Sequence, residues 1–255
     1  MEAVILCGGK DILLNKSAGH VPNTLFDING KPVIWHVMNQ LGRHGIRDFI
    51  LPLGRKGGMI REYFNNYAIN NHDYKLSLGE NRITFCDKPE QDWNLVFADA
   101  GIDAQTGALL KRAEKHITQE PFLVMYGNGM WNVRIDKLLE QHEKMKRMAT
   151  AAGTDYKSDK GILTVKAGVA TAYLQKPKIS LIVSAGLFAF TKGVFQYLSD
   201  DKNCTLEPML LKKLTAIDEL AVYKHDGFWM DIDTDKDLEA ARHNYQFLNH
   251  NTKDA

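Results

Sequence analysis

The sequence predicts an α/β fold built on a Rossmann-like, doubly wound sheet, and three observations support this prediction. Short apolar runs with strand composition alternate with segments of helical periodicity along the first half of the chain. The first apolar run ends in Gly8-Gly9, and a nearly continuous apolar run at 121–126 ends in Gly127-Asn128-Gly129. Such alternation is typical of a parallel sheet with helices on both faces, and ligands of these folds bind at the carboxyl ends of the strands. We therefore expect the ligand site where the two glycine turns meet.

Length and composition indicate an ordinary globular chain and argue against several classes of partner. A chain of 255 residues, 44% hydrophobic and 25% charged, can bury a full-sized core. The net charge of +1, without a Lys/Arg block, gives no reason to expect nucleic-acid binding. No stretch is apolar enough to predict a membrane span or a secretory leader. Because Cys7, Cys86 and Cys204 are few and widely spaced, reduced and partly buried thiols in the cytoplasm are expected.

The first half of the chain alternates strands and helices. Ala3 to Leu6 is the first strand, and Pro32 then opens a helix in a position where proline is tolerated. Alternation around Gly79-Glu80-Asn81 predicts an antiparallel hairpin over 75–87. The remaining elements expected here are a helix to Gly45, a strand at 46–53, a helix at 59–67, a strand at 94–98 and a helix that begins at Thr106-Gly107.

The second half of the chain is less regular. The run at 121–126 is expected to be a central strand buried on both faces. It is followed by a helix at 135–148 that turns Leu138, Leu139 and Met145 inward. Further on we expect short strands within 161–174, a strand at 181–190, a helix at 206–215, a strand at 219–224 and a helix at 235–248. Without a linker or repeat, 1–255 is interpreted as a single domain with a C-terminal helical extension at about 205–255.

Several segments resemble the sugar nucleotidyltransferases. EAVILCGG at 2–9 and NGKPVIWH at 29–36 are similar to the start of that family, and HGIRDFI at 44–50 and TGALLKR at 106–112 follow in the same order. Within the family, these segments are most similar to those of the glucose-1-phosphate cytidylyltransferases. The resemblance implies a mixed sheet of the type found in nucleotidyltransferases, which is GT-A-like. It also suggests a homo-oligomer.

The same resemblance implies four charged groups for catalysis, and three of them are replaced. At the family's spacing the Arg of its glycine-rich loop falls on Leu13, the Lys of its Pro-Lys-Pro motif on Asn23, and its Gly-Asp-Gly carboxylate on Asn128. A loop glycine falls on Asp11, which adds an anion, whereas the late metal-binding Asp is kept as Asp233. Because nucleotidyl transfer depends on charge neutralisation, these replacements predict impaired catalysis.

Ligand contacts are expected at the positions that match the family's binding segments. Its Glu-Lys-Pro motif is matched by Gln175-Lys176-Pro177, in which Lys176 is either a phosphate contact or a surface lysine beside a turn proline. Its Asn-Gly-Gly-Phe segment is matched by 184–187 and its late Glu-Pro by Glu207-Pro208. The full set of expected ligand-binding residues is Gly8, Gly9, Asp11, Asn23, Thr106, Gly107, Gly127, Asn128, Gln175, Lys176, Gly186 and Glu207.

Other chemistries find little support in the sequence. No Walker A sequence, G-x-S-x-G elbow or Cys/His zinc spacing occurs. A calcium loop that begins at Asp231 would need glycine and glutamate at its sixth and twelfth positions, where Lys236 and Arg242 stand. The alternating residues that suggested such a loop are Asp231, Asp233, Asp235 and Asp237.

Two functions follow from this reading. The first is a catalytically impaired or inactive homologue that binds a nucleotide, a nucleotide sugar or a sugar phosphate, or that regulates a partner. The alternative is an active enzyme that joins CTP or another nucleoside triphosphate to a sugar phosphate, forms CDP-glucose or a related nucleotide sugar, and releases pyrophosphate. Mg²⁺, with Asp233 as a ligand, is implied only in the second case. The replaced charges favour the first.

Overall fold

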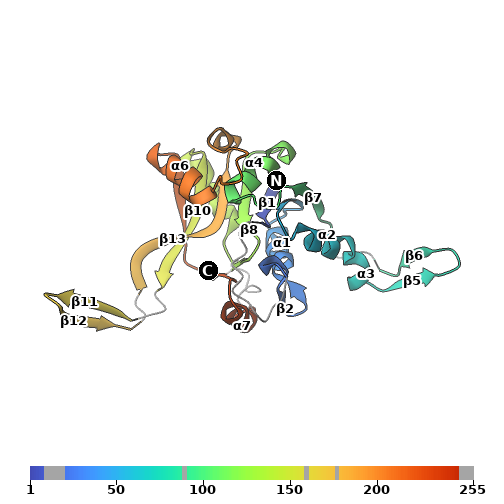
Figure 1. The fold of residues 1–255 in the computed structure, drawn as a ribbon, viewed down its shortest axis with the longest axis horizontal. Helices are drawn as coiled ribbons and strands as arrows, with labels where there is room; N and C mark the ends of the chain where they lie inside the picture. Colours follow the sequence, from blue (N-terminus) through green and yellow to red (C-terminus); the bar gives the residue numbers. More distant parts are fainter. Residues whose placement is uncertain (9–20, 88–90, 158–160, 176–177, 247–255) are drawn as a thin grey trace.

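The computed structural model describes residues 1–8, 21–87, 91–157, 161–175 and 178–246, and a seven-stranded sheet forms its centre (Figure 1). The strands of this sheet are β1 (Glu2–Leu6), β4 (Asp48–Leu53), β7 (Asn94–Asp99), β8 (Phe122–Tyr126), β10 (Ala149–Lys157), β13 (Lys178–Phe190) and β14 (Leu220–His225). They lie in the order β14-β10-β13-β8-β1-β4-β7. Strands β8, β1, β4 and β7 are parallel, β13 is antiparallel to both of its neighbours, and β10 is parallel to β14. The predicted mixed, doubly wound sheet is confirmed.

Helices cover both faces of the sheet, as expected. Side chains of β1 alternate between two cores: Ala3 and Ile5 face the core that includes the first helix, and Val4 and Leu6 face the other. Burial on both faces explains why the central strands are continuous apolar runs. The helical segments are η1 (Asn23–Leu25), α1 (Val33–Arg43), α2 (Gly57–Asn65), α3 (Tyr67–Asn71), α4 (Thr106–Ala113), η2 (Glu114–His116), α5 (Ile135–Met145), η3 (Lys192–Tyr197), η4 (Leu206–Leu211), α6 (Lys212–Ala216) and α7 (Asp235–His243).

Four two-stranded sheets accompany the central one. Two of them, β2 (Asp27–Ile28) with β3 (Lys31–Pro32) and β9 (Gly129–Trp131) with β15 (Trp229–Asp231), lie against the body. The other two are hairpins that project from opposite sides of the molecule (Figure 1). They are β5 (Tyr74–Ser77) with β6 (Arg82–Phe85), and β11 (Ile162–Lys166) with β12 (Val169–Leu174).

The topology determines where a ligand site can form. Strand β1 pairs with β4 on one side and β8 on the other, and the chain reaches β4 and β7 before it crosses back to β8. The chain leads from β1 to β4 and from β8 to β10, in opposite directions along the sheet, and ligands of open α/β sheets bind beside such a reversal. The backbone N–H of Gly127 donates to the carbonyl oxygen of Leu6 at 3.2 Å. The two glycine turns are thus neighbours, as predicted.

Several details differ from the expectation. Helix α5 ends at Met145, because Lys146 takes a left-handed conformation (φ 51°), and Met145 itself is 41% exposed rather than inward. The helix expected at 206–215 is divided into the π-helical η4 and α6. The thiol-bearing residue Cys86 is exposed, whereas Cys7 and Cys204 are buried. Among the described residues, none of the helices combines the length and apolarity needed to cross a membrane.

Candidate functional site

The floor of the candidate site is backbone at the carboxyl ends of β1 and β8. A Cβ at Gly8 would lie 3.0 Å from the backbone nitrogen of Gly54, and one at Gly127 would lie 2.8 Å from Cγ2 of Thr24. Both positions therefore require glycine for close packing. Because Thr24 is buried against Gly127, segment η1, which begins at Asn23, is held beside the end of β8.

Asn128 and Asp233, which the sequence places 105 residues apart, meet at this edge. The side-chain amide of Asn128 donates to Oδ1 of Asp233 at 2.8 Å, and the carbonyl oxygen of Asn128 accepts from the backbone N–H of Ile232 at 3.0 Å. The pairing of β9 with β15, in which Gly129 faces Asp231, brings the two segments together. An amide donor therefore occupies the side of the Asp233 carboxylate where the family would place a second carboxylate.

Asp231 lies beside this pair and is the most perturbed acid of the site. Burial, with a smaller contribution from the negative charges of Asp233 and Asp237, raises the pKa of Asp231 to about 7. Near neutral pH this carboxyl therefore carries less negative charge than an ordinary aspartate.

The aspartates that alternate in the sequence differ in their contacts. The carboxylate of Asp237 caps α7, since its Oδ2 accepts from the N–H of Thr234 at 2.9 Å and from the Thr234 hydroxyl at 2.8 Å. Among the described residues no group of three or more His, Cys, Asp or Glu side chains has a geometry that could hold a metal. Mg²⁺ is usually held by one or two carboxylates together with phosphate oxygens, and here the Asn128 amide donates to one of the two neighbouring carboxyl groups, that of Asp233.

A second polar cluster lies on the other side of β8. The hydroxyl of Tyr126, the last residue of β8, donates to Oε1 of Glu207 on η4. The hydroxyl oxygen of Thr106, at the start of α4, accepts from the backbone N–H of Leu206 at 2.9 Å. Burial and the neighbouring Glu207 charge raise the pKa of Tyr126 far above its ordinary value, so the phenol keeps its proton.

Glycines and one tryptophan determine the shape of this second cluster. Gly186 has φ +66°, and a Cβ there would lie 2.7 Å from Cδ2 of Tyr126, so the ring packs directly against the Gly186 backbone. The indole N–H of Trp229 donates to the carbonyl oxygen of Ala185 at 2.8 Å. Gly107 is also tightly packed, because a Cβ there would lie 2.8 Å from the backbone of Thr205.

The structure thus brings together most of the residues that the sequence singled out. Gln175 is exposed at the end of β12, where its side chain accepts from the Tyr173 hydroxyl, away from the sheet edge. The expectations for Gly9, Asp11, Leu13 and Lys176 lie outside the described residues. Sequence reasoning missed Tyr126 and Thr24, although Tyr126 is the one polar side chain in an otherwise apolar central strand.

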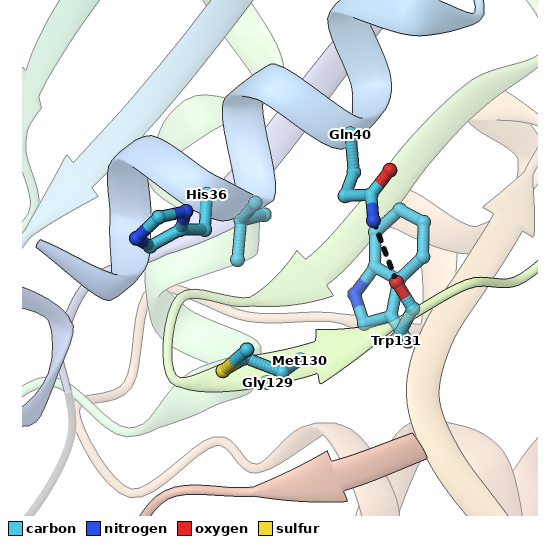
Figure 2. A pocket seen from close by; sticks show the side chains of 6 residues that line it. His36, Gln40, Gly129, Met130 and Trp131 are labelled. Atoms are coloured by element: carbon cyan, nitrogen blue, oxygen red, sulfur yellow. Dashed lines mark hydrogen bonds between the residues drawn. The ribbon is translucent and has the colours of Figure 1, made fainter. Parts of the chain in front are cut away.

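Two hollows elsewhere on the molecule are weaker candidates for a ligand site than this edge. One lies between α1 and β9, where Gln40 donates to the carbonyl oxygen of Trp131 at 3.3 Å (Figure 2). It has no room for a water molecule. The other is an open hollow of about 450 Å³ beside the end of α4, where Lys111 pairs with Glu114 at 2.7 Å and Arg112 donates to the Asp200 carbonyl oxygen at 3.0 Å.

Comparison with known proteins gives a consistent result. The family model described as nucleotidyl transferase matches residues 2–246. The chain is 37% identical over 238 residues to a protein of Bacillus subtilis (strain 168) described as probable glucose-1-phosphate cytidylyltransferase, and 34% identical over 239 residues to glucose-1-phosphate cytidylyltransferase of Salmonella typhimurium. Each match covers 93% of both chains.

A solved structure supports the fold. HddC from Yersinia pseudotuberculosis, complexed with GMP-PN, superposes with a TM-score of 0.69 at 20% sequence identity. The superposition covers 96% of this chain and 99% of HddC. At this level of identity the likeness concerns the arrangement of the strands and helices.

Proposed function

The chain belongs to the nucleotidyl transferase family, as the resemblance indicated, and from that premise we propose that it binds a nucleotide sugar, or a part of one, without Mg²⁺-dependent transfer. The observation that carries the proposal is the hydrogen bond of 2.8 Å from the Asn128 amide to Asp233. It uses the retained carboxylate for a contact within the protein and leaves Asp231, whose pKa is raised by burial, as the other carboxyl beside it.

The chemistry of nucleotidyl transfer explains why this matters. A sugar phosphate oxygen must attack the α-phosphorus while pyrophosphate leaves, and catalysis comes mainly from positioning and charge stabilisation. Each lost electrostatic contact of this type costs about 10²- to 10³-fold in rate. In this chain Leu13, Asn23 and Asn128 stand at the positions of three such groups, and Asp11 adds a negative charge.

The names of the relatives suggest the first ligands to test. Both of the relatives described above carry the name glucose-1-phosphate cytidylyltransferase. CTP, glucose 1-phosphate and CDP-glucose are therefore the first ligands, and Lys176 is the side chain we propose to contact their phosphate groups. The setting we propose is the cytoplasm, in line with the three unpaired cysteines.

The test is a pair of measurements on the purified chain. Pyrophosphate release from CTP, and from the other nucleoside triphosphates, is assayed with glucose 1-phosphate and Mg²⁺, and the Bacillus subtilis relative is the positive control. We expect no release by this chain, together with calorimetric binding of CDP-glucose that EDTA does not change. Clear release of pyrophosphate would instead support the alternative, an active transferase, which the 34–37% identity favours.

We further propose that the chain forms a homo-oligomer in which a second copy covers the β11–β12 hairpin. An isolated two-stranded hairpin is marginally stable in water, and this one exposes apolar side chains on both of its faces. The hairpins of one molecule point in opposite directions, so each can reach a different neighbour (Figure 1). The apolar side chains of β11–β12, between 53% and 66% exposed, are Leu163, Val165, Val169, Tyr173 and Leu174.

Light scattering after size-exclusion chromatography tests this assembly. The unmodified chain is expected at a multiple of the monomer mass, and Leu163→Glu combined with Val165→Glu is expected to shift it toward the monomer. Ile102→Glu is the matched control, because Ile102 is 65% exposed but lies outside both hairpins. A monomer at every concentration of the unmodified chain would contradict the proposal.

A further inference from the structure

The open hollow of about 450 Å³ beside the end of α4 is lined by charged side chains, none of which belongs to the sheet edge between β1 and β8. Its volume lies within the range of small-molecule sites, roughly 300 to 1,000 Å³. The residues that line it come from α4, from η2 and from the loops that follow β7 and precede η4. They are Asp99, Lys111, Arg112, Glu114, Lys115 and Asp200.

Arg112 is fixed at this hollow by neutral groups. Its guanidinium donates to the backbone carbonyl oxygen of Ala100 and, at 3.0 Å, to that of Asp200, so it joins two different loops. The guanidinium also packs against the backbone of Gly101, which has φ +78° and where a Cβ would lie 2.5 Å from a terminal nitrogen of Arg112. Carbonyl groups orient a guanidinium without cancelling its charge, and a guanidinium carries five N–H donors in all.

Only part of the charge that lines the hollow is neutralised within the protein. Lys111 pairs with Glu114 at 2.7 Å and also donates to the carbonyl oxygen of Phe195 at 3.3 Å. The other lining groups form no ion pair with any residue that the structure describes. These groups are the cations Arg112 and Lys115 and the carboxylates Asp99 and Asp200.

These four groups determine which ligand chemistry suits the hollow. A guanidinium and an ammonium bind phosphate, whereas ionised carboxylates repel phosphate and accept hydrogen bonds from hydroxyl groups. An inorganic anion would satisfy the two cations and would be repelled by the two aspartates. A neutral sugar would satisfy the aspartates alone. A small molecule that carries both a phosphate group and hydroxyl groups meets both requirements.

We propose that this hollow is a second ligand site, which takes a small phosphorylated sugar or polyol. Arg112 and Lys115 bind the phosphate group, and Asp99 and Asp200 accept hydrogen bonds from the hydroxyl groups. The inference goes beyond the proposed function, because this ligand carries no nucleotide and lies away from the edge between β1 and β8. The two proposals can therefore fail independently of each other.

Calorimetric titration with glucose 6-phosphate, inorganic phosphate and glucose tests the site, with CDP-glucose present in excess to occupy the sheet edge. We expect glucose 6-phosphate to bind about 10- to 100-fold more tightly than phosphate, and glucose not to bind. Arg112→Gln should lower the affinity for glucose 6-phosphate about 10- to 100-fold, and Lys115→Gln, at an exposed position, about 3-fold. Lys144→Gln, which removes an exposed lysine of α5, is the matched control and should change nothing.

Asp200→Asn provides a readout that a merely structural role would not give. The change removes an ionised acceptor of hydroxyl groups and a charge that repels phosphate, so we expect weaker binding of glucose 6-phosphate and tighter binding of inorganic phosphate. If Arg112→Gln lowers the urea midpoint, Lys115→Gln and Asp200→Asn decide.

Three results would overturn the proposal. Equal affinity for phosphate and glucose 6-phosphate would show an adventitious ion only. Binding that CDP-glucose displaces, or that the variants of the hollow leave unchanged, would place the ligand elsewhere. Absence of binding by glucose 6-phosphate would show that the hollow is not a site for this class of ligand.

Discussion

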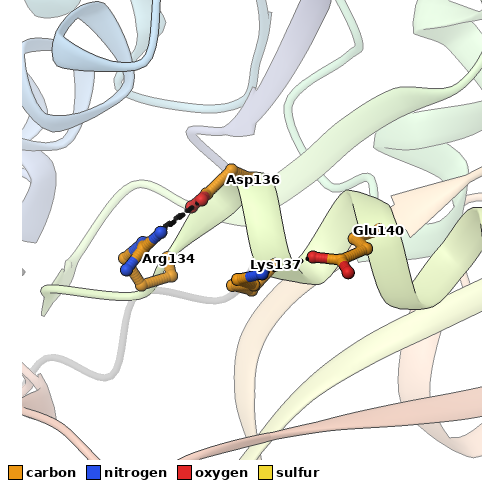
Figure 3. Close-up of polar contacts among 4 residues, drawn as sticks. All are labelled: Arg134, Asp136, Lys137 and Glu140. Carbon is orange, nitrogen blue, oxygen red and sulfur yellow. Dashed lines mark hydrogen bonds and ion pairs between the residues drawn. The ribbon is translucent and has the colours of Figure 1, made fainter. Parts of the chain in front are cut away.

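Carboxylates on α5 and carboxylates at the sheet edge are held by different kinds of donor. On α5, Nε of Arg134 donates to Asp136 at 2.9 Å and Nζ of Lys137 lies 2.6 Å from Glu140, so each anion faces a cation (Figure 3). At the edge, Asp233 is held by an amide and Glu207 by a phenol, both of which are neutral.

The two regions also differ in the pKa values of their acids, and here the cause at the edge is burial. The Arg134 guanidinium, through its hydrogen bond, lowers the pKa of Asp136 to about 2, whereas burial raises the pKa of Asp231 at the edge to about 7. Neutral donors fix the geometry of a carboxylate without cancelling its charge. The donors at the edge therefore fix the geometry of the carboxylates alone, whereas the surface pairs of α5 also neutralise their charge.

The largest expected effect comes from moving Tyr126 away from Glu207. Gly186→Ala combines a left-handed backbone with a Cβ 2.7 Å from the Tyr126 ring, and should cost about 3 kcal/mol of unfolding free energy. Gly168→Ala is the control, since Gly168 has φ +81° but no atom within 4 Å, and should cost about 1 kcal/mol. Urea unfolding measures both, and equal losses would show that the ring contact is unimportant.

Restoring the family's charges should convert the Asn128 side of the edge into a metal-dependent site. The combined change Asp11→Gly, Leu13→Arg, Asn23→Lys and Asn128→Asp is expected to strengthen CTP binding in the presence of Mg²⁺ about a hundredfold. Asn128→Asp alone should not do so. Calorimetry with CTP and Mg²⁺ decides between them, and tight Mg²⁺-dependent binding by the unmodified chain would contradict our reading of this edge.

The single change Asn128→Asp should instead destabilise the fold as pH rises. It places two carboxylates within hydrogen-bond distance, so the pair shares a proton at low pH, and its pKa in the folded state is raised. Stability is then full near pH 4, where the carboxyl groups of the unfolded chain are protonated as well, and is lost progressively toward pH 8, by about 2 kcal/mol. Asn128→Ala, which adds no charge, should show a loss that does not vary with pH. Urea midpoints at both pH values provide the measurement.

Buried histidines give the unmodified chain the opposite pH dependence of stability, a loss as the pH falls. Burial lowers the pKa of His36, His142 and His225, so the folded state keeps them neutral while the unfolded chain begins to bind protons near pH 6.5. Stability is therefore full above that pH and falls as the pH drops below it. His142→Gln should weaken the fall in urea midpoint between pH 7.5 and 5.5, whereas a change at the exposed His243 should leave it unaltered.

The smallest effect is expected on α5. The ion pair of Lys137 with Glu140 joins two exposed side chains three residues apart, and such pairs add little to stability because water and salt screen them. Lys137→Ala should leave the urea midpoint within experimental error at both low and high salt. A clear fall in the urea midpoint would mean that this surface ion pair stabilises the fold, which would contradict our description of the α5 pairs.

The sequence by itself determined the fold class, the family and the strand ends that form the site. Burial of the central strands on both faces demands continuous apolar runs, and close packing of the chain turns demands glycine at Gly8 and Gly127, so both leave a local signature. The family was likewise readable, because its segments keep their order along the chain. Strands β9 and β15 were not predicted, since three-residue strands have too few residues to show a period.

Only the tertiary structure decided what the polar residues of the edge contact. Asn128 meets Asp233 across 105 residues, and Tyr126 meets Glu207 across 81, through the pairing of β9 with β15 and the packing of η4 beside β8. A side chain's partner at such separations depends on how whole elements pack, which no local pattern records. The sequence therefore showed that charges are missing from the site, and the packing of distant elements determined that an amide and a phenol hold the carboxylates that remain.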